Sequence, residues 1–278
     1  MIKSYRIIEK LIDRYDYGGA LELMREEQLT GTVPAILVDS CRYAINFDFS
    51  TAMQILNELP QETRDDKTLR ELTKNLRELI AGDPSAIFSE LLENIKFQVV
   101  NEQFIDFLGR VYRCKEAIFK YIFVKKHLNI NRFSFHIEVM QKRNILKILN
   151  KKYKIFNANL VYGISTYIQR NLREEPRYIE IARVMNAQKM DDLIELRNGS
   201  IVGHGFTGVS IDDIYRVYGN PYNVLDDFKE CLTKLDIRLN RYKYSIINDY
   251  IMDELHKIHV QGLTESQLKA LESGGETL

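Results

Sequence analysis

An arginine, an asparagine and a histidine lie close together in a glycine-rich stretch of the chain. The stretch spans residues 196–206 and reads LRNGSIVGHGF. The planar guanidinium of Arg197 is suited to neutralising a phosphate. Histidine is the natural residue type for proton transfer at neutral pH, and His204 could serve in this role. With the Asn198 amide to orient one of them, these are the parts that metal-free cleavage of an RNA phosphodiester requires.

The spacing of arginine and histidine alone carries little information, because a chain with this many arginines matches it by chance. An asparagine directly after the arginine makes the match rarer, and the match falls where a long helix is expected to end. Gly203 and Gly205 flank the histidine and permit unusual backbone angles and close approach of a substrate. The alternative is structural: Arg197 and the Asn198-Gly199 pair simply terminate the helix.

The elements that must position these residues read as helices. Apolar residues recur at spacings of three and four nearly throughout, and only five prolines interrupt 278 residues. We predict an all-α protein. One helix is expected within 62–81, and the apolar residues of 84–108 are expected to form a helix face in the same way. The glycine-rich run 200–210 is too short to support a sheet. Helix starts are expected at Asp83-Pro84, Asn220-Pro221 and the capping box Ser210–Asp213.

An internal repeat marks the N-terminal part of the chain. Residues 15–24 (YDYGGALELM) align with residues 47–56 (FDFSTAMQIL) at an offset of 32. This period is typical of helix-turn-helix repeats, although two copies are fewer than a free solenoid needs. We therefore predict scaffold hairpins over 1–82, a helical body carrying the arginine–histidine motif over 83–261, and a C-terminal helix with a mobile tail over 262–278.

The net charge of zero excludes a uniformly basic protein but hides an uneven distribution. Residues 110–154 carry 13 basic and two acidic side chains, a net charge of +11 between two acidic regions. Aromatic residues interleave this basic block, which is typical of surfaces that bind phosphates and stack on bases. The alternative is a solvated helix face with core aromatics behind it. The candidates for RNA binding are Lys125, Lys126, Lys151, Lys152 and Lys154.

Several classes of protein are disfavoured by what the sequence lacks. No apolar run is long enough to span a membrane, and the N-terminus does not read as a signal peptide. The three cysteines are odd in number and widely spaced, which fits a reducing cytoplasm rather than a disulfide framework or a zinc site. We expect a cytoplasmic protein that needs no metal and no cofactor and does not bind a membrane.

The motif Arg197-Asn198-x5-His204 in an all-helical chain resembles the HEPN (higher eukaryotes and prokaryotes nucleotide-binding) ribonucleases. The hairpins within 15–56 also resemble, loosely, the helical part of the HEPN ribonucleases of type III CRISPR systems. The resemblance implies a helical bundle of HEPN type preceded by helix-turn-helix hairpins. Such proteins usually carry a CARF (CRISPR-associated Rossmann fold) domain that binds cyclic oligoadenylate. No strand–helix alternation is visible here, so we expect the effector half, with a CARF domain absent from this chain.

The resemblance also implies roles for the motif. Arg197 would bind the scissile phosphate, His204 would transfer protons, and Asn198 would position one of them. The substrate would be single-stranded RNA, cut without metal to 2′,3′-cyclic phosphate and 5′-hydroxyl ends in type III CRISPR antiviral defence. Two protomers would form a composite active site, which predicts a homodimer. The alternatives are a HEPN toxin of a toxin–antitoxin pair, and a non-catalytic helical adaptor or RNA-binding module.

Overall fold

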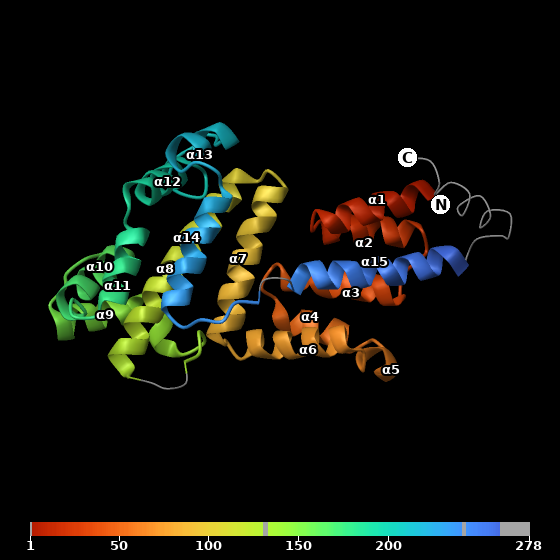
Figure 1. Cartoon of the computed structure of the whole chain (residues 1–278), viewed down its shortest axis with the longest axis horizontal. Helices are drawn as coiled ribbons and strands as arrows, with labels where there is room; N and C mark the ends of the chain where they lie inside the picture. Colours follow the sequence, from red (N-terminus) through yellow and green to blue (C-terminus); the bar gives the residue numbers. More distant parts are fainter. Residues whose placement is uncertain (1, 130–132, 241–242, 262–278) are drawn as a thin grey trace. The chain divides into compact units, whose positions relative to one another are not determined.

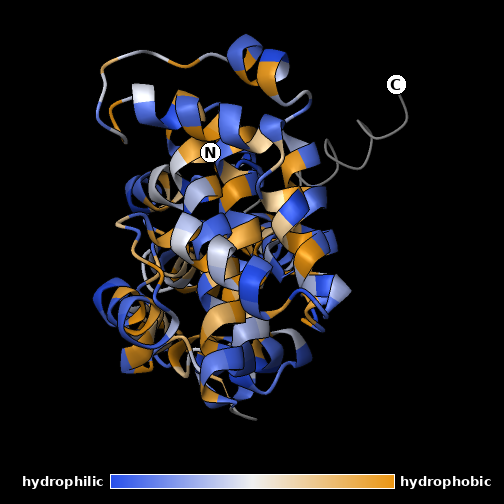
Figure 2. Ribbon diagram, turned by 90° about the vertical axis from the view of Figure 1, so that its left-hand side faces the viewer, coloured by the Kyte–Doolittle hydropathy of each residue, from blue (hydrophilic) through white to orange (hydrophobic). Residues whose placement is uncertain are grey.

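The computed structural model describes residues 2–129, 133–240 and 243–261, and every secondary-structure element within these ranges is a helix (Figure 1). Within these ranges there is no strand, which confirms the predicted all-α class. Apolar and polar residues alternate along the helices (Figure 2), as expected when each helix buries one face. In Lys67–Ile80, for example, leucines at positions 69, 72, 76 and 79 are all buried.

The chain divides into two compact units, one formed by residues 1–80 with 242–278 and the other by residues 81–241. The helices of unit 1 are α1 (Ile2–Asp13), α2 (Tyr17–Glu26), α3 (Val33–Ala44), α4 (Phe49–Leu56), α5 (Gln61–Arg64), α6 (Lys67–Ile80) and α15 (Lys243–Gln261). Those of unit 2 are α7 (Pro84–Val100), α8 (Phe104–Leu128), the 3-10 helix η1 (Glu138–Met140), α9 (Lys142–Tyr153), α10 (Leu160–Asn171), α11 (Pro176–Met185), α12 (Gln188–Gly199), α13 (Ile211–Val217) and α14 (Tyr222–Lys234).

The repeat seen in the sequence forms two corners of the same geometry in unit 1. Tyr15 and Phe47 both have left-handed backbones, with φ of 61° and 63°. The following residues, Asp16 and Asp48, cap α2 and α4 by accepting hydrogen bonds from backbone N–H groups three residues on. Each alanine of the repeat is fully buried, and Ser40 of α3 donates to the Ala52 carbonyl at 2.9 Å. The small side chain therefore allows close packing of the two helices.

The last described helix, α15, completes unit 1. α15 packs against α1, α3 and α6. Its Asn248 is buried, accepts a hydrogen bond from the Tyr17 hydroxyl at 2.8 Å and donates to the Ile12 carbonyl at 2.9 Å. These two bonds join the C-terminal helix to the first hairpin.

Unit 2 is built around α7 and α8, with α14 packed against both (Figure 1). Both central helices bury residues on most of their circumference, and α8 also contacts α10, α12 and η1. The predicted start of α7 is confirmed, because the Asp83 carboxylate accepts from the Ala86 N–H at 3.1 Å. The capping box at the start of α13 is confirmed too. α14 begins one residue later than expected, at Tyr222, with Pro221 at its cap.

The apolar pattern over 84–108 does not form one helix. α7 ends at Val100 and α8 begins at Phe104. Between them Glu102 has φ of 56°, and the Gln103 N–H bonds back to the Gln98 carbonyl at 2.8 Å. This is the six-to-one bond of a Schellman helix end. The apolar spacing continues through the corner because both helices bury that face in the same core.

The observed division of the chain differs from the predicted one at the C-terminal side. The predicted boundary between 82 and 83 lies two residues from the observed one, but we expected 83–261 to form a single body. Instead α15 belongs to unit 1 and packs on the N-terminal helices. Its buried residues are Tyr244, Ile247, Ile251 and Leu255. The predicted segment 262–278 lies outside the described residues. Among the helices that are described, none is long and apolar enough to cross a membrane.

Candidate functional site

The predicted motif lies at the C-terminal end of α12. Ser200, which is fully buried, ends the helix: its N–H and its hydroxyl both donate to the Arg197 carbonyl, at 3.1 and 2.8 Å. This local arrangement satisfies a carbonyl that the helix end would otherwise leave unpaired. The chain then turns back toward the end of α12.

The glycine-rich segment after Ser200 packs against the helix end. The His204 N–H donates to the Asn198 carbonyl at 3.0 Å, and the Thr207 N–H donates to the Gly199 carbonyl at 2.9 Å. A Cβ atom at position 203 or 205 would overlap the backbone of α12. Neither glycine has a left-handed backbone. The predicted unusual backbone angles are therefore not found, and the structure gives another reason for these glycines: they let the loop pack closely against α12.

The Arg197 side chain is held over an aromatic ring. Its guanidinium carbon lies 4.8 Å from the centroid of the Tyr112 ring, which α8 contributes. Burial raises the pKa of Tyr112, with Glu116 adding to this, while the nearby Arg197 charge lowers it in part. The ring therefore stays neutral and offers its π face to the cation. The contact fixes where the guanidinium lies.

Two further contacts order the arginine and the asparagine. Arg197 Nη1 donates to Asn198 Oδ1 at 3.2 Å, and Asn198 Nδ2 lies 3.4 Å from Glu195 Oε1. Arg197 Nε is buried and has no hydrogen-bond partner in the described part of the chain. A buried donor without an acceptor is costly, and an anion placed beside it would remove that cost.

His204 presents its side chain to solvent. The residue is exposed, and its imidazole makes no hydrogen bond to any described residue. Its neighbours in the loop are also unusual: the side chains of Ile201 and Phe206 are 70% and 94% exposed. Sequence reasoning missed these two residues. The signal was two large apolar residues inside a glycine-rich turn, where polar residues are the rule.

A buried ion pair supports the helix that carries the motif. Lys115 of α8 is 3% exposed, and its ammonium group lies 3.3 Å from the Asp191 carboxylate of α12. Burial lowers the pKa of Lys115, and Asp191 opposes that shift. Lys115 belongs to the basic block of the sequence, yet it fastens α12 to α8 and faces no solvent. The pairing of Lys115 with Asp191, which was not predicted from the sequence, holds in place the helix that carries the motif.

The structure does not place the predicted RNA-binding lysines beside the arginine–histidine motif. Lys125 and Lys126 lie near the C-terminal end of α8, thirteen residues or more beyond Tyr112. At 1.5 Å per residue this is about 20 Å along the helix axis. Lys126 is paired with Glu175 at 2.6 Å, and Lys125 donates to the Tyr121 hydroxyl at 2.9 Å. Lys125 and Lys126 thus lie farther along α8 than the motif, toward the C-terminal end of the helix.

The remaining predicted lysines lie at the end of α9 and are exposed: Lys151, Lys152 and Lys154. α9 also carries Lys142, Arg143 and Lys147 and contains no acidic residue. None of these six cations pairs with a carboxylate among the described residues. Among the described residues of the basic block, α9 and the residue that follows it therefore form the cluster of cations without carboxylate partners.

Unit 2 thus carries a partly buried arginine and an exposed histidine at one end of α12, and a separate cationic surface on α9. Over residues 2–129, 133–240 and 243–261 no group of three or more histidine, cysteine, aspartate or glutamate side chains could hold a metal ion. No protein-family model matches the chain, and no curated protein matches it in a sequence search.

Proposed function

We propose that the chain is a metal-independent endoribonuclease of HEPN type that cleaves single-stranded RNA. The observation that carries this proposal is the hydrogen bond from the His204 N–H to the Asn198 carbonyl, which holds the backbone of His204 against the helix end that carries Arg197. A partly buried arginine and an exposed histidine therefore belong to the same helix end. This pairing suits charge neutralisation and proton transfer at one phosphate.

The chemistry follows from these two groups. The Arg197 guanidinium binds the scissile phosphate and stabilises the negative charge that builds on its oxygens. A general base takes the proton of the ribose 2′-hydroxyl, and the 2′-oxygen attacks the adjacent phosphorus. The bond from phosphorus to the 5′-oxygen breaks, and a general acid protonates that oxygen. The products are a 2′,3′-cyclic phosphate and a 5′-hydroxyl, so no water is consumed and no metal is needed.

A homodimer belongs to the proposal for a chemical reason. The reaction needs a base and an acid in the same turnover, and one histidine cannot be in both protonation states at once. A second protomer would bring a second His204 to the same cleft. The exposed Ile201 and Phe206 beside the histidine favour such pairing, since large apolar side chains are costly to leave in water. Isologous contact around a two-fold axis would bury them against their own copies.

The place of the enzyme in type III CRISPR antiviral defence is part of this proposal and rests on the resemblance of the motif and the hairpins. A CARF domain contains a Rossmann fold, and the described residues contain no strand. Regulation by cyclic oligoadenylate would therefore act through residues outside those described.

The direct test is the chemistry of the RNA ends. Purified protein treated with EDTA is incubated with end-labelled single-stranded RNA, and the products are resolved before and after treatment with a phosphatase that opens cyclic phosphates. We expect cleavage in EDTA, with cyclic phosphate on the upstream fragment and a free hydroxyl on the downstream fragment. Products with 5′-phosphate ends, or cleavage that requires a divalent cation, would contradict the proposal.

A second candidate function is a non-catalytic RNA-binding module, which the unpaired cations of α9 favour. In that case Arg197, engaged with Tyr112 and Asn198, would be structural. RNA binding without any cleavage in the assay above would support this function.

The cationic surface of α9 is expected to bind the RNA backbone away from the cleavage site. Replacing Lys151 and Lys152 together by glutamine should weaken RNA binding and reduce its dependence on salt. Each lost phosphate contact lowers the slope of log K against log salt by about 0.7 for single strands, so two contacts lower it by about 1.4. The measurement is fluorescence anisotropy at several salt concentrations.

The matched control for this pair replaces two exposed lysines of unit 1, Lys10 and Lys67, by glutamine. The charge change is the same, so long-range attraction is lowered equally. An equal reduction of the slope in both double variants would show that α9 has no specific part in binding RNA.

A further inference from the structure

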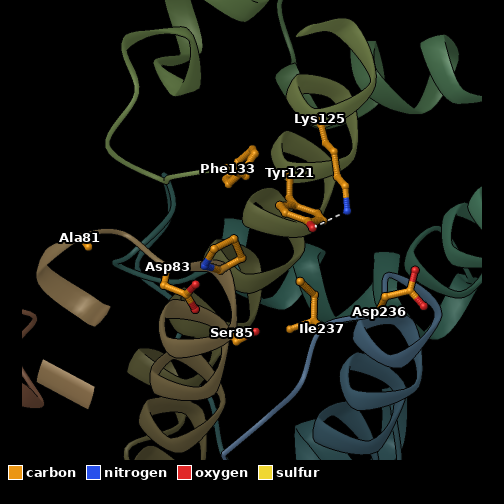
Figure 3. Close-up of a pocket in the computed structure, with 9 residues that line it drawn as sticks. Ala81, Asp83, Ser85, Tyr121, Lys125, Phe133, Asp236 and Ile237 are labelled. Atoms are coloured by element: carbon orange, nitrogen blue, oxygen red, sulfur yellow. Dashed lines mark hydrogen bonds between the residues drawn. The ribbon is translucent and has the colours of Figure 1, made fainter. Parts of the chain in front are cut away.

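A cavity of about 430 Å³ lies at the N-terminal end of α7, and all of its lining residues belong to unit 2 (Figure 3). Its volume falls in the range of small-molecule sites. It is separate from the arginine–histidine motif, since none of the motif residues lines it. The lining residues that could bind a ligand are Asp83, Ser85, Tyr121, Lys125, Phe133 and Asp236.

One wall of the cavity is aromatic. The rings of Tyr121 and Phe133 meet edge to face, with centroids 4.7 Å apart. Tyr121 is buried at 4% exposure, whereas Phe133 is only half-buried and keeps part of its ring accessible. A fixed aromatic ring with an accessible surface is a platform on which a planar heterocycle stacks.

Lys125 brings a positive charge to the cavity that no described carboxylate neutralises. Each of the other three lysines of α8 pairs with a carboxylate: Lys115 with Asp191, Lys120 with Glu116 and Lys126 with Glu175. The Lys125 ammonium instead donates to the neutral hydroxyl of Tyr121 at 2.9 Å, as Figure 3 shows. Its ammonium group therefore has two further N–H donors for an anion.

The opposite side of the cavity offers acceptors. One carboxylate oxygen of Asp83 accepts from the Ala86 N–H, and one oxygen of Asp236 pairs with Arg177 at 3.1 Å. The second oxygen of each has no hydrogen-bond partner among the described residues. A carboxylate can only accept, so a ligand seated here must present N–H or O–H groups to it.

We propose that this cavity binds a nucleotide. The base stacks on Phe133, the phosphate pairs with Lys125, and the exocyclic amine of the base and the ribose hydroxyls donate to Asp83 and Asp236. A guanine is favoured over a uracil, because its ring N–H and its amine lie side by side and together suit one carboxylate. The nucleotide comes from a single-stranded RNA or from a free mononucleotide. In the first case the inference rests on the proposed function and places a base-recognition site about 20 Å along α8 from the cleavage site.

The test measures binding of guanosine 5′-monophosphate and uridine 5′-monophosphate to the full chain by isothermal titration calorimetry. We expect guanosine monophosphate to bind more tightly. Phe133→Leu and Lys125→Met should each weaken its binding about tenfold or more, which corresponds to about 1.4 kcal/mol. The controls are Tyr222→Leu, which removes an exposed aromatic ring outside the cavity, and Lys67→Met, which removes an exposed cation of unit 1. Thermal melting of every variant reports on folding.

A second arm uses a single-stranded oligonucleotide that contains guanine and distinguishes the two sources. If Phe133→Leu weakens binding of the oligonucleotide but not of the monophosphate, the site takes a nucleotide within a strand. If it weakens binding of both probes, the site also accepts a free nucleotide. If the folded pocket variants bind both probes as the wild type does, or if neither probe binds the wild type, the inference is wrong. If the wild type cleaves RNA but the folded pocket variants bind both probes as the wild type does, this inference alone is overturned. If a nucleotide binds in the cavity but the protein does not cleave RNA, only the ribonuclease proposal is overturned.

Discussion

Replacing His204 by alanine is expected to reduce RNA cleavage by about 100- to 10,000-fold, the usual contribution of a positioned acid or base. The side chain is exposed and makes no hydrogen bond to described residues, so its removal leaves the fold intact. The thermal melting temperature should therefore match that of the wild type. RNA affinity should change little, because the phosphate contact belongs to Arg197 and the cationic surface belongs to α9.

The control for this variant is His256→Ala, since His256 is an exposed histidine on α15 of unit 1 and plays no part in the proposed chemistry. It should cleave RNA as the wild type does. Full activity of His204→Ala would contradict the ribonuclease proposal. Loss of activity accompanied by a large drop in melting temperature would show that the histidine is structural.

The same variant tests the composite site. If each cleft needs His204 from both protomers, only dimers of two wild-type chains are active. An equimolar mixture that has exchanged subunits then retains roughly a quarter of the activity rather than half. The measurement mixes wild-type and His204→Ala protein at fixed total concentration and follows initial rates. A linear dependence on the wild-type fraction would show that each protomer acts by itself.

Replacing Gly205 by alanine is expected to lower the rate of RNA cleavage by about 100-fold, although no side chain of the arginine–histidine motif is changed. The new Cβ would overlap the Gly199 backbone, so the loop must move away from the end of α12. The bonds from the His204 N–H and the Thr207 N–H to the helix end would be strained or lost. A displacement of about 1 Å is enough for a loss of this size, because proton transfer demands precise placement.

Gly208→Ala is the matched control, because a Cβ at that position meets nothing within 4 Å. Both variants make the same chemical change in the same loop, three residues apart. Initial cleavage rates and unfolding free energies are compared, and overpacking at Gly205 should cost about 1–3 kcal/mol. Equal activities of the two variants would show that the loop's contact with α12 does not position the histidine.

Much of the helical structure was readable in the sequence because its causes are local. The cap at Asp83 and the capping box at Ser210 depend on side chains that reach backbone groups three residues away. The buried leucines of α6 follow from the helical period alone. The aromatic–aspartate pairs at 15–17 and 47–49 likewise form matching corners, since the aspartate caps the next helix within the same turn.

Predictions failed where distant packing decided the outcome. The corner at Glu102 was hidden because the apolar spacing continues across it. The position of α15 was missed because its partners lie near the other end of the chain, more than 200 residues away. The basic block reads as one surface in the sequence, yet Lys115 is buried against Asp191 while α9 remains exposed.

The sequence by itself determined the helical class, the two repeated corners and the chemical types within the arginine–histidine motif, because these depend on residues close together in the chain. Only the tertiary structure decided that His204 lies against the end of α12, that Tyr112 supports Arg197, and that the cations of α9 lie apart from the motif. The reason is that these relations depend on how helices of unit 2 pack, and packing joins residues that no local spacing connects.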